Sequence, residues 1–341
     1  MTLSQINWIE PVELTNAEGV PEQYHQFESK SASAIRAAIG ARRPLLVRGQ
    51  PGVGKTQLAH AAAKLLKRPI VQIVVDSRTE SRDLMWNYDP VKRLADAQLE
   101  AAIAAVRQSS ENSTAGTTKS HDTRREEIKA ALRPSNYIQP GPLWWAFDWE
   151  GAQRQADISG CDHETYQEPA NPRNGVVMLI DEIDKAESDV PNGLLEALGS
   201  NRFRPFGFHE DILTQGESPL VVITTNEERS LPDAFVRRCV VLQLALPTEP
   251  KELEELLVER GKIHFKTQAS SQPKIFEKAA EMLVKDRTRA NELRRMPLPG
   301  QAEYLDLLRA VFSWSETNET KSLELLNELR EFTLRKNLDP S

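Results

Sequence analysis

The stretch PLLVRGQPGVGKTQLAHAAA, residues 44–63, decides how this chain folds. It contains Gly49, four further residues and then Gly54-Lys55-Thr56, which is the G-x-x-x-x-G-K-[ST] spacing of a phosphate-binding loop. The apolar residues before the loop predict a strand, and those after it recur at helix spacing. A glycine-rich turn that carries a lysine by chance is the alternative. The strand before and the helix after favour the phosphate loop.

The loop also predicts which residues contact a nucleotide. Its glycines let the backbone curl so that N–H groups face phosphate oxygens, and the following helix adds the positive end of its dipole. The Lys55 ammonium would reach the β- and γ-phosphates, and the Thr56 hydroxyl would bind Mg²⁺. The predicted nucleotide-binding residues are Gly49, Gln50, Pro51, Gly52, Val53, Gly54, Lys55, Thr56 and Gln57. No N/T-K-x-D base-reading motif is found, so we expect ATP rather than a guanine nucleotide.

A second stretch, VVMLIDEIDK at residues 176–185, runs from five apolar residues straight into Asp181 and Glu182. Buried strands do not normally end in two adjacent carboxylates. They can do so at a magnesium–phosphate site, where the Asp holds the metal. The neighbouring Glu is then the candidate to orient and deprotonate the attacking water. Because acidic residues favour helix starts, capping of the next helix is the alternative.

Two further polar features follow the strand pattern VVITTN, which ends at Asn226. The Asn226 amide offers a donor and an acceptor for the water or a γ-phosphate oxygen, although asparagine is also common in plain turns. Arg237 and Arg238 come later, before another apolar run. An arginine presented to a neighbouring subunit's nucleotide is worth roughly 10³–10⁵ in rate where it acts in trans. A solvated basic helix end is the alternative for both arginines.

The apolar runs of the whole chain indicate an α/β fold. Near-continuous apolar runs alternate with helix-periodic segments, which predicts a doubly wound parallel sheet with helices on both faces. The predicted strands are residues 45–47, 70–75, 176–180, 220–224 and 240–244. We expect a nucleotide-binding domain over residues 1–247, with insertions at about 88–140 and 148–175. The charged, helix-periodic remainder, residues 248–341, predicts a small all-helical domain.

Composition excludes several classes of protein. The net charge of −7 does not favour a protein that coats nucleic acid. With 2 cysteines among 341 residues, a disulfide framework and a multi-cysteine zinc site are both excluded. We find no apolar run of the ~20 residues that a membrane span needs, and no signal-peptide pattern at the start. We therefore expect a cytoplasmic protein.

Taken in order, GQPGVGKT, LIDEIDKA, TTN and AFVRRC resemble the motifs of AAA+ ATPases. Flanking segments such as YIQPGPLWWAF and SLPDAFVRRC are similar to the MoxR-like and dynein-related branch. The resemblance implies a five-stranded P-loop sheet followed by a helical lid, and Mg²⁺-dependent ATP hydrolysis. It implies that Asn226 is the first sensor and that Arg238, with Arg237 second, is the arginine finger.

The same resemblance implies partners. Such proteins commonly form rings, often hexamers, and remodel a protein or another macromolecule. MoxR-like members often act with von Willebrand factor A-type proteins. We weigh one alternative of a different class, which is a slow ATP-dependent assembly switch or scaffold in a stress or conflict system.

The chain departs from the family pattern in the predicted lid. The segment LPGQAEYLDLLRA resembles the helix that normally carries a second-sensor arginine, but Ala302 stands at that position. Either Arg294 or Arg295 supplies the charge, or the sensor is absent.

Three aromatic features are less specific. Trp144 and Trp145 favour packing over a role in gripping a substrate, since tryptophans are mostly buried. The stretch NRFRPFGF, residues 201–208, either contacts a nucleic acid or peptide in a channel or forms a packed hairpin. Tyr24 and Phe27 are candidates to border the adenine.

Overall fold

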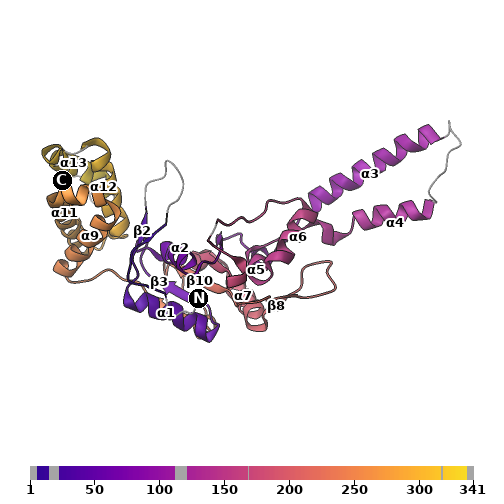
Figure 1. The fold of residues 1–341 in the computed structure, drawn as a ribbon, viewed down its shortest axis with the longest axis horizontal. Helices are drawn as coiled ribbons and strands as arrows, with labels where there is room; N and C mark the ends of the chain where they lie inside the picture. The colour runs from indigo at the N-terminus through magenta and orange to yellow at the C-terminus, as the bar shows by residue number, and fades with distance from the viewer. Residues whose placement is uncertain (1–5, 15–22, 112–120, 168, 316–317, 336–341) are drawn as a thin grey trace. The chain divides into compact units, whose positions relative to one another are not determined.

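The computed structural model describes residues 6–14, 23–111, 121–167, 169–315 and 318–335 (Figure 1). Its main sheet has five strands in the order β11-β3-β10-β7-β4. The strands are β3 (Leu45–Arg48), β4 (Ile70–Val74), β7 (Val177–Asp181), β10 (Leu220–Thr225) and β11 (Val240–Gln243). β3 pairs in parallel with β10 and β11, and β4 pairs in parallel with β7. All five predicted strands and the doubly wound fold class, with helices on both sides of the sheet, are therefore confirmed.

Burial along the sheet follows the strand order. β3, β7 and β10 are buried over nearly their whole length, as their continuous apolar runs predict. The edge strands β4 and β11 are only partly buried, and Val74 and Val241 are exposed. An apolar run therefore marks a strand of this sheet without fixing whether both of its faces are covered.

The contacts of the chain divide it into two units. One unit comprises Met1–Leu66, Val222–Ser230 and Cys239–Ser341. The other comprises Lys67–Val221 and Leu231–Arg238. The expected boundary between residues 247 and 248 stays a prediction.

The first unit carries the phosphate loop and the C-terminal helices. Its N-terminal part consists of β1 (Val12–Glu13), β2 (Tyr24–His25), α1 (Ser29–Ala41), β3 and α2 (Lys55–Leu66). The helices that follow the sheet are α9 (Pro250–His264), α10 (Lys266–Ser271), α11 (Pro273–Glu292), α12 (Gln301–Ser315) and α13 (Glu319–Thr333). No strand lies beyond residue 247 in the described part of the chain, as the charged helical pattern predicts.

The C-terminal helices enclose their own apolar core. Leu257 of α9, Phe276 of α11, and Tyr304 and Leu308 of α12 are all buried completely. Proline at the first position of α9 and of α11 suits a helix start, because that N–H has no partner within the helix. These helices therefore have a packed interior of their own.

The second unit holds β4, β7 and the two regions that are expected to be insertions. In the first region, β5 (Trp86–Tyr88) pairs antiparallel with β6 (Ile138–Pro140), and α3 (Pro90–Glu111) and α4 (His121–Ala131) lie between them in sequence. In the second region, α6 (Trp149–Ser159) precedes β7. In Figure 1, α3 and α4 form an extended arm, and α6 lies near the base of that arm.

The tryptophan pair packs inside the second unit. Trp144 and Trp145 lie on α5 (Pro142–Phe147) and are 2% and 3% exposed. The Trp144 ring packs edge-on against Phe203 and Phe208, with centroids 6.0 and 5.4 Å away. The packing interpretation of both tryptophans is confirmed.

Candidate nucleotide-binding site

The phosphate loop connects the end of β3 at Arg48 to the start of α2 at Lys55. Two of its glycines are required by the backbone. A Cβ on Gly49 would overlap the carbonyl oxygen of Leu244, and Gly54 has a φ of +91°, which side chains rarely adopt. The loop therefore has the strand–turn–helix form that its sequence predicts.

The Lys55 side chain is buried and fixed by three hydrogen bonds. It is 7% exposed, and its Nζ donates hydrogen bonds to the carbonyl oxygens of Gly49 and Gln50 at 2.8 and 2.9 Å. The same Nζ donates to Oδ1 of Asn226 at 2.7 Å. Asn226 follows β10, and the pairing of Thr225 with Arg48 brings the ends of β10 and β3 side by side. The structure thus joins two residues that were predicted separately to belong to the site.

The acidic pair lies in the other unit, at the end of β7. Asp181 is the last residue of the strand, and Glu182 follows it with a φ of +61°. Left-handed backbone at a residue with a side chain costs roughly 1–2 kcal/mol and is often found at functional positions. Glu182 makes no side-chain cap to the short turn Ile183–Lys185, so the capping alternative finds no support at this residue.

Lys185 contacts Glu182, the candidate base, although the sequence alone indicates no role for Lys185. Its Nζ lies 2.6 Å from Oε2 of Glu182, and the two side chains are 44% and 31% exposed. The signal that could have found this pair is the three-residue spacing in DEIDK. The pair orients the Glu182 carboxylate at the surface of its unit.

Both candidate finger arginines follow α8 (Asp233–Val236) and are exposed. Arg237 is the C-cap residue of this helix, and the N–H of Arg238 bonds to the carbonyl of Phe235 at 3.0 Å. Within the described residues, the Arg238 guanidinium makes no hydrogen bond or ion pair. An arginine that serves a neighbouring subunit must be accessible, and both arginines meet this requirement.

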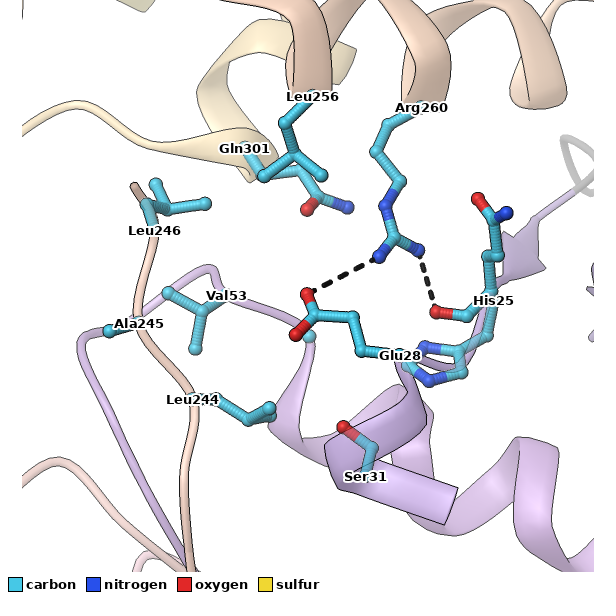
Figure 2. Close-up of a pocket in the computed structure, with 12 residues that line it drawn as sticks. His25, Glu28, Ser31, Val53, Leu244, Ala245, Leu246, Leu256, Arg260 and Gln301 are labelled. Carbon is cyan, nitrogen blue, oxygen red and sulfur yellow. Dashed lines mark hydrogen bonds and ion pairs between the residues drawn. The ribbon is translucent and has the colours of Figure 1, made fainter. Parts of the chain in front are cut away.

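A pocket lies beside the loop, within the first unit (Figure 2). Its cavity volume is only about 30 Å³, far below the roughly 300–1,000 Å³ of ligand pockets. Apolar and polar side chains both line it, among them His25, Val53, Leu244, Leu246, Leu256 and Arg260. Burial, followed by the charge of Arg260, lowers the pKa of His25 to about 3, so this ring is neutral at pH 7. In this conformation the pocket is too small for a nucleotide base.

Arg260 of α9 closes one side of this pocket. Its Nη1 donates to the carbonyl oxygen of Gln26 at 2.8 Å, and its Nη2 lies 3.7 Å from Oε1 of Glu28 (Figure 2). Tyr24 and Phe27 are buried, but they are not among the residues that line the pocket. The pocket wall is made instead by the residues between them, His25 and Gln26.

Comparison with known protein families shows the family to which the chain belongs. A family model described as AAA domain (dynein-related subfamily) matches residues 44–239. That span is more than half of the chain, and it contains the loop, the acidic pair, Asn226 and both arginines. The chain belongs to this AAA family. No curated protein matches it.

Solved structures that resemble this AAA protein include two forms of RuvB from Thermotoga maritima. The P216G mutant is 18% identical, with 88% of this chain and 68% of that chain covered and a TM-score of 0.43. The structure titled RuvB Holliday junction branch migration motor is also 18% identical, with 88% and 67% covered and a TM-score of 0.42. At these values the likeness carries no argument about activity or substrate.

The AAA protein has the oxygen ligands that a magnesium ion prefers. Mg²⁺ is usually held by one or two carboxylates or hydroxyls together with substrate phosphates, rather than by a cage of protein ligands. Thr56 in the first turn of α2 and Asp181 at the end of β7 fit this donor set. The described part of the chain has no cluster of three or more His, Cys, Asp or Glu side chains that could hold a metal ion.

The position that lacks the second-sensor arginine lies against the phosphate loop. A Cβ on Gly52 would come within 3.0 Å of the Cβ of Ala302, in the first turn of α12. The helix therefore approaches the loop as the resemblance implies, but it presents a methyl group. Arg294 is exposed and follows the end of α11.

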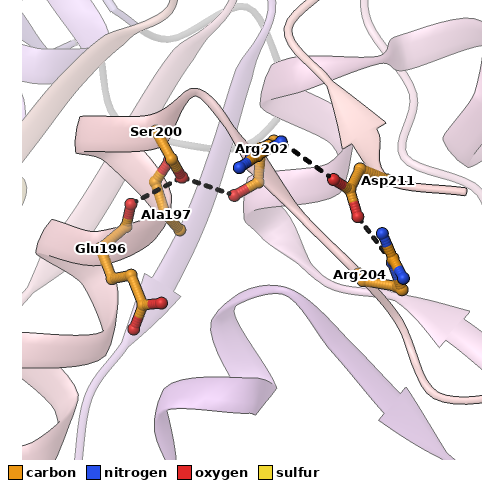
Figure 3. Close-up of polar contacts among 6 residues, drawn as sticks. All are labelled: Glu196, Ala197, Ser200, Arg202, Arg204 and Asp211. Carbon is orange, nitrogen blue, oxygen red and sulfur yellow. Dashed lines mark hydrogen bonds and ion pairs between the residues drawn. The ribbon is translucent and has the colours of Figure 1, made fainter.

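The candidate channel stretch of the AAA protein forms a small hairpin in the second unit. β8 (Arg202–Phe203) pairs antiparallel with β9 (Ile212–Leu213). Arg202 and Arg204 lie on either side of Asp211, at 3.4 and 2.6 Å from its carboxylate oxygens (Figure 3). The hydrogen bond from Arg204 lowers the pKa of Asp211. Asp211 thus offsets the charge of this stretch, which weakens the case for binding a nucleic acid.

No helix among the described residues is long and apolar enough to cross a membrane.

Proposed function

We propose that this AAA protein is a Mg²⁺-dependent ATPase that forms a ring and acts as a MoxR-like remodeller of a protein or other macromolecular partner. The observation that carries ATP hydrolysis is the 2.7 Å hydrogen bond from Lys55 to Asn226. It places the cation that would bind the β- and γ-phosphates against the amide that would sense them.

In the proposed reaction, water attacks the γ-phosphorus in line, and the bond from phosphorus to the β–γ bridging oxygen breaks to give ADP and phosphate. Glu182 accepts the proton of the attacking water. Lys55 and an Arg238 from the adjacent subunit stabilise the charge that develops on the phosphoryl oxygens. A magnesium ion, held by Thr56 and Asp181, would supply further positive charge to the β- and γ-phosphate oxygens. Asn226 holds the water or a γ-phosphate oxygen.

We assign the base of the nucleotide to the region beside the loop, where the pocket would have to widen to admit it. Val53, Leu244 and Leu246 offer apolar contact, and the neutral His25 ring adds a flat face. Arg260 ties helix α9 to the main chain at Gln26, so the lid and the base-binding segment are held together.

The proposed assembly is a homo-oligomeric ring, and we expect a hexamer. The exposed Arg238 supports it, because an arginine finger completes a site only in a neighbouring subunit. A von Willebrand factor A-type protein is the partner that the MoxR-like resemblance favours. The net charge of −7 does not favour a nucleic-acid substrate, and we place the protein in the cytoplasm.

The experiment measures ATP turnover per subunit and native mass, with ATP and Mg²⁺, over a range of protein concentrations. For the wild-type chain, turnover should rise steeply as rings assemble. Arg238→Ala should lower turnover by roughly 10³-fold while ATP binding is kept. Arg237→Ala is the matched comparison and should have a much smaller effect. If Arg237→Ala lowered turnover more than Arg238→Ala, Arg237 would be the arginine finger.

The assembly switch is the second candidate function, and the apolar Ala302 at the sensor position favours it. A switch would bind ATP tightly, assemble, and turn over negligibly at every concentration. That result in the experiment above would reject the remodeller and establish the switch.

A further inference from the structure

The first turn of α12 carries Ala302 at the position where the resemblance implies a positively charged arginine. Ala302 lies against the phosphate loop at Gly52, yet it offers no group that can contact a phosphate. A lid that distinguishes ATP from ADP needs a cation at the phosphate end of the nucleotide, because the two ligands differ there by one phosphoryl group.

Such a cation reaches the loop from a different helix. Arg287 lies on α11, and its Nη2 donates a hydrogen bond to Oε1 of Gln50 at 3.0 Å. Its Nη1 donates to the carbonyl oxygen of Pro299 at 2.7 Å, just before the start of α12. One guanidinium thus connects α11, the entry to α12 and the second residue of the loop.

Gln50 lies between two cations. Its main-chain oxygen accepts a hydrogen bond from Lys55, and its side-chain oxygen accepts one from Arg287. The Gln50 side chain is exposed, whereas Arg287 is partly buried. An exposed amide is a neutral partner for a guanidinium, whereas a phosphate oxygen adds the attraction of an opposite charge. A phosphate oxygen arriving at the loop would therefore compete well for Nη2.

The surroundings of Arg287 suit this exchange. Burial lowers the pKa of Arg287, and the charge of Glu303 acts in the opposite direction. Arginine keeps its charge even so, because its ordinary pKa lies far above neutrality. A guanidinium is also more weakly hydrated than an ammonium, and its planar fork matches phosphate oxygens.

We propose that Arg287 is the lid arginine that contacts the terminal phosphate of ATP, in place of the side chain that is missing at Ala302. It exchanges the amide oxygen of Gln50 for a γ-phosphate oxygen while the Pro299 carbonyl holds its other amino group. The lid helices α11 and α12 would then respond to the presence of the γ-phosphate. This inference rests on the proposed function, because it requires ATP at the loop.

The test compares the affinity for Mg²⁺–ATPγS with the affinity for Mg²⁺–ADP by calorimetry on the full chain. Arg287→Ala should weaken ATPγS binding by roughly 10–100-fold and ADP binding by less than about threefold. Arg287→Lys, which keeps the charge but loses the fork, should give an intermediate ratio of affinities. Arg289→Ala, an exposed arginine on the same helix, is the matched control and should leave both affinities unchanged.

Equal weakening of ATPγS and ADP by Arg287→Ala would overturn the inference, because a merely structural role predicts that result. Unchanged affinities in a variant with a wild-type circular dichroism spectrum would also overturn it. If the wild-type chain bound neither nucleotide, the proposed function would fail, and this inference with it. If the wild type binds both nucleotides and Arg287→Ala loses affinity for both equally, only the role of Arg287 is refuted and the proposed function stands.

Discussion

The Nζ of Lys55 donates a hydrogen bond across 2.7 Å to Oδ1 of Asn226, and this contact joins residues 171 positions apart in sequence. It exists because β3 and β10 are parallel neighbours whose carboxyl ends lie side by side. The side chain of Lys55 is therefore held against the amide that we propose as the first sensor. Substitutions at the two positions should nevertheless separate binding from turnover.

Lys55→Ala should weaken the binding of ATPγS by at least roughly 100-fold, because several charge-assisted hydrogen bonds to phosphate are removed. The measurement is calorimetry with Mg²⁺–ATPγS. Lys64→Ala is the control, since Lys64 is an exposed lysine later on the same helix. Binding at the wild-type affinity would contradict the assignment of Lys55.

Asn226→Ala should lower the turnover number by roughly 10²-fold, the usual cost of losing one group that stabilises developing charge. ATPγS affinity should fall by no more than a few-fold, because Lys55 keeps its two carbonyl acceptors in the loop. Steady-state kinetics and binding are measured on the same preparation. A matched fall in both quantities would mean that Asn226 only positions Lys55.

Glu182→Gln should keep ATP binding but lower turnover by roughly 10²–10⁴-fold, because the amide cannot accept the proton of the attacking water. ATP-bound assemblies should then persist in native mass measurements. Loss of the exposed ion pair with Lys185 should cost less than about 1 kcal/mol of stability. Turnover at the normal rate would show that another residue is the base.

Asp286→Asn should destabilise the C-terminal helices by about 3 kcal/mol. Asp286 is 1% exposed and accepts hydrogen bonds from Arg330 at 2.5 and 2.6 Å and from Arg335 at 3.2 Å. Neutralising it leaves two arginines without their shared carboxylate, and breaking a buried pair is costly. Urea unfolding provides the measurement.

The control is Glu281→Gln on the same helix, which removes an exposed ion pair with Lys278. It should change the free energy of unfolding by less than about 1 kcal/mol. Similar losses in the two variants would show that the Asp286 cluster is no stronger than a surface pair.

Acid should weaken the protein through His264 at the end of α9. Burial, followed by the charges of Arg309 and Arg260, lowers the pKa of His264 to about 4, from 6.5 in the unfolded chain. Between these values the unfolded state binds the proton and the folded state does not. The stability contributed by the neutral ring is therefore complete above pH 6.5 and is lost as the pH falls toward 4.

His264→Asn should remove this part of the pH dependence. Its free energy of unfolding should fall less than that of the wild type between pH 7 and pH 4.5, by a difference on the order of 2 kcal/mol. Urea unfolding at the two pH values measures it. Equal slopes for the two proteins would assign the acid sensitivity to other groups.

The chemistry of the loop could be predicted from sequence because it is local. The glycine spacing, the lysine and the hydroxyl stand next to one another in residues 49–56, and the strand before and the helix after confirm their context. The same holds for the acidic pair at the end of β7, since a carboxylate after an apolar run is visible without any partner. The five strands were found for the same reason, although their apolar content alone did not show that β4 and β11 lie at the edges.

Which side chains meet that loop could not be predicted. Arg287 lies 237 residues from Gln50, and Arg260 lies 234 residues from Gln26, so no spacing rule connects either pair. The sequence left open whether Arg294 or Arg295 supplies the missing charge or the second sensor is absent, and no spacing in it indicates Arg287. A helix presents its long side chains by the direction of its axis and by the angle at which it packs, and neither is written in the order of residues. The sequence by itself therefore determined the fold class and the phosphate-loop motif, and only the packing of α9, α11 and α12 decided which arginines and which methyl group lie against the loop and the segment before it.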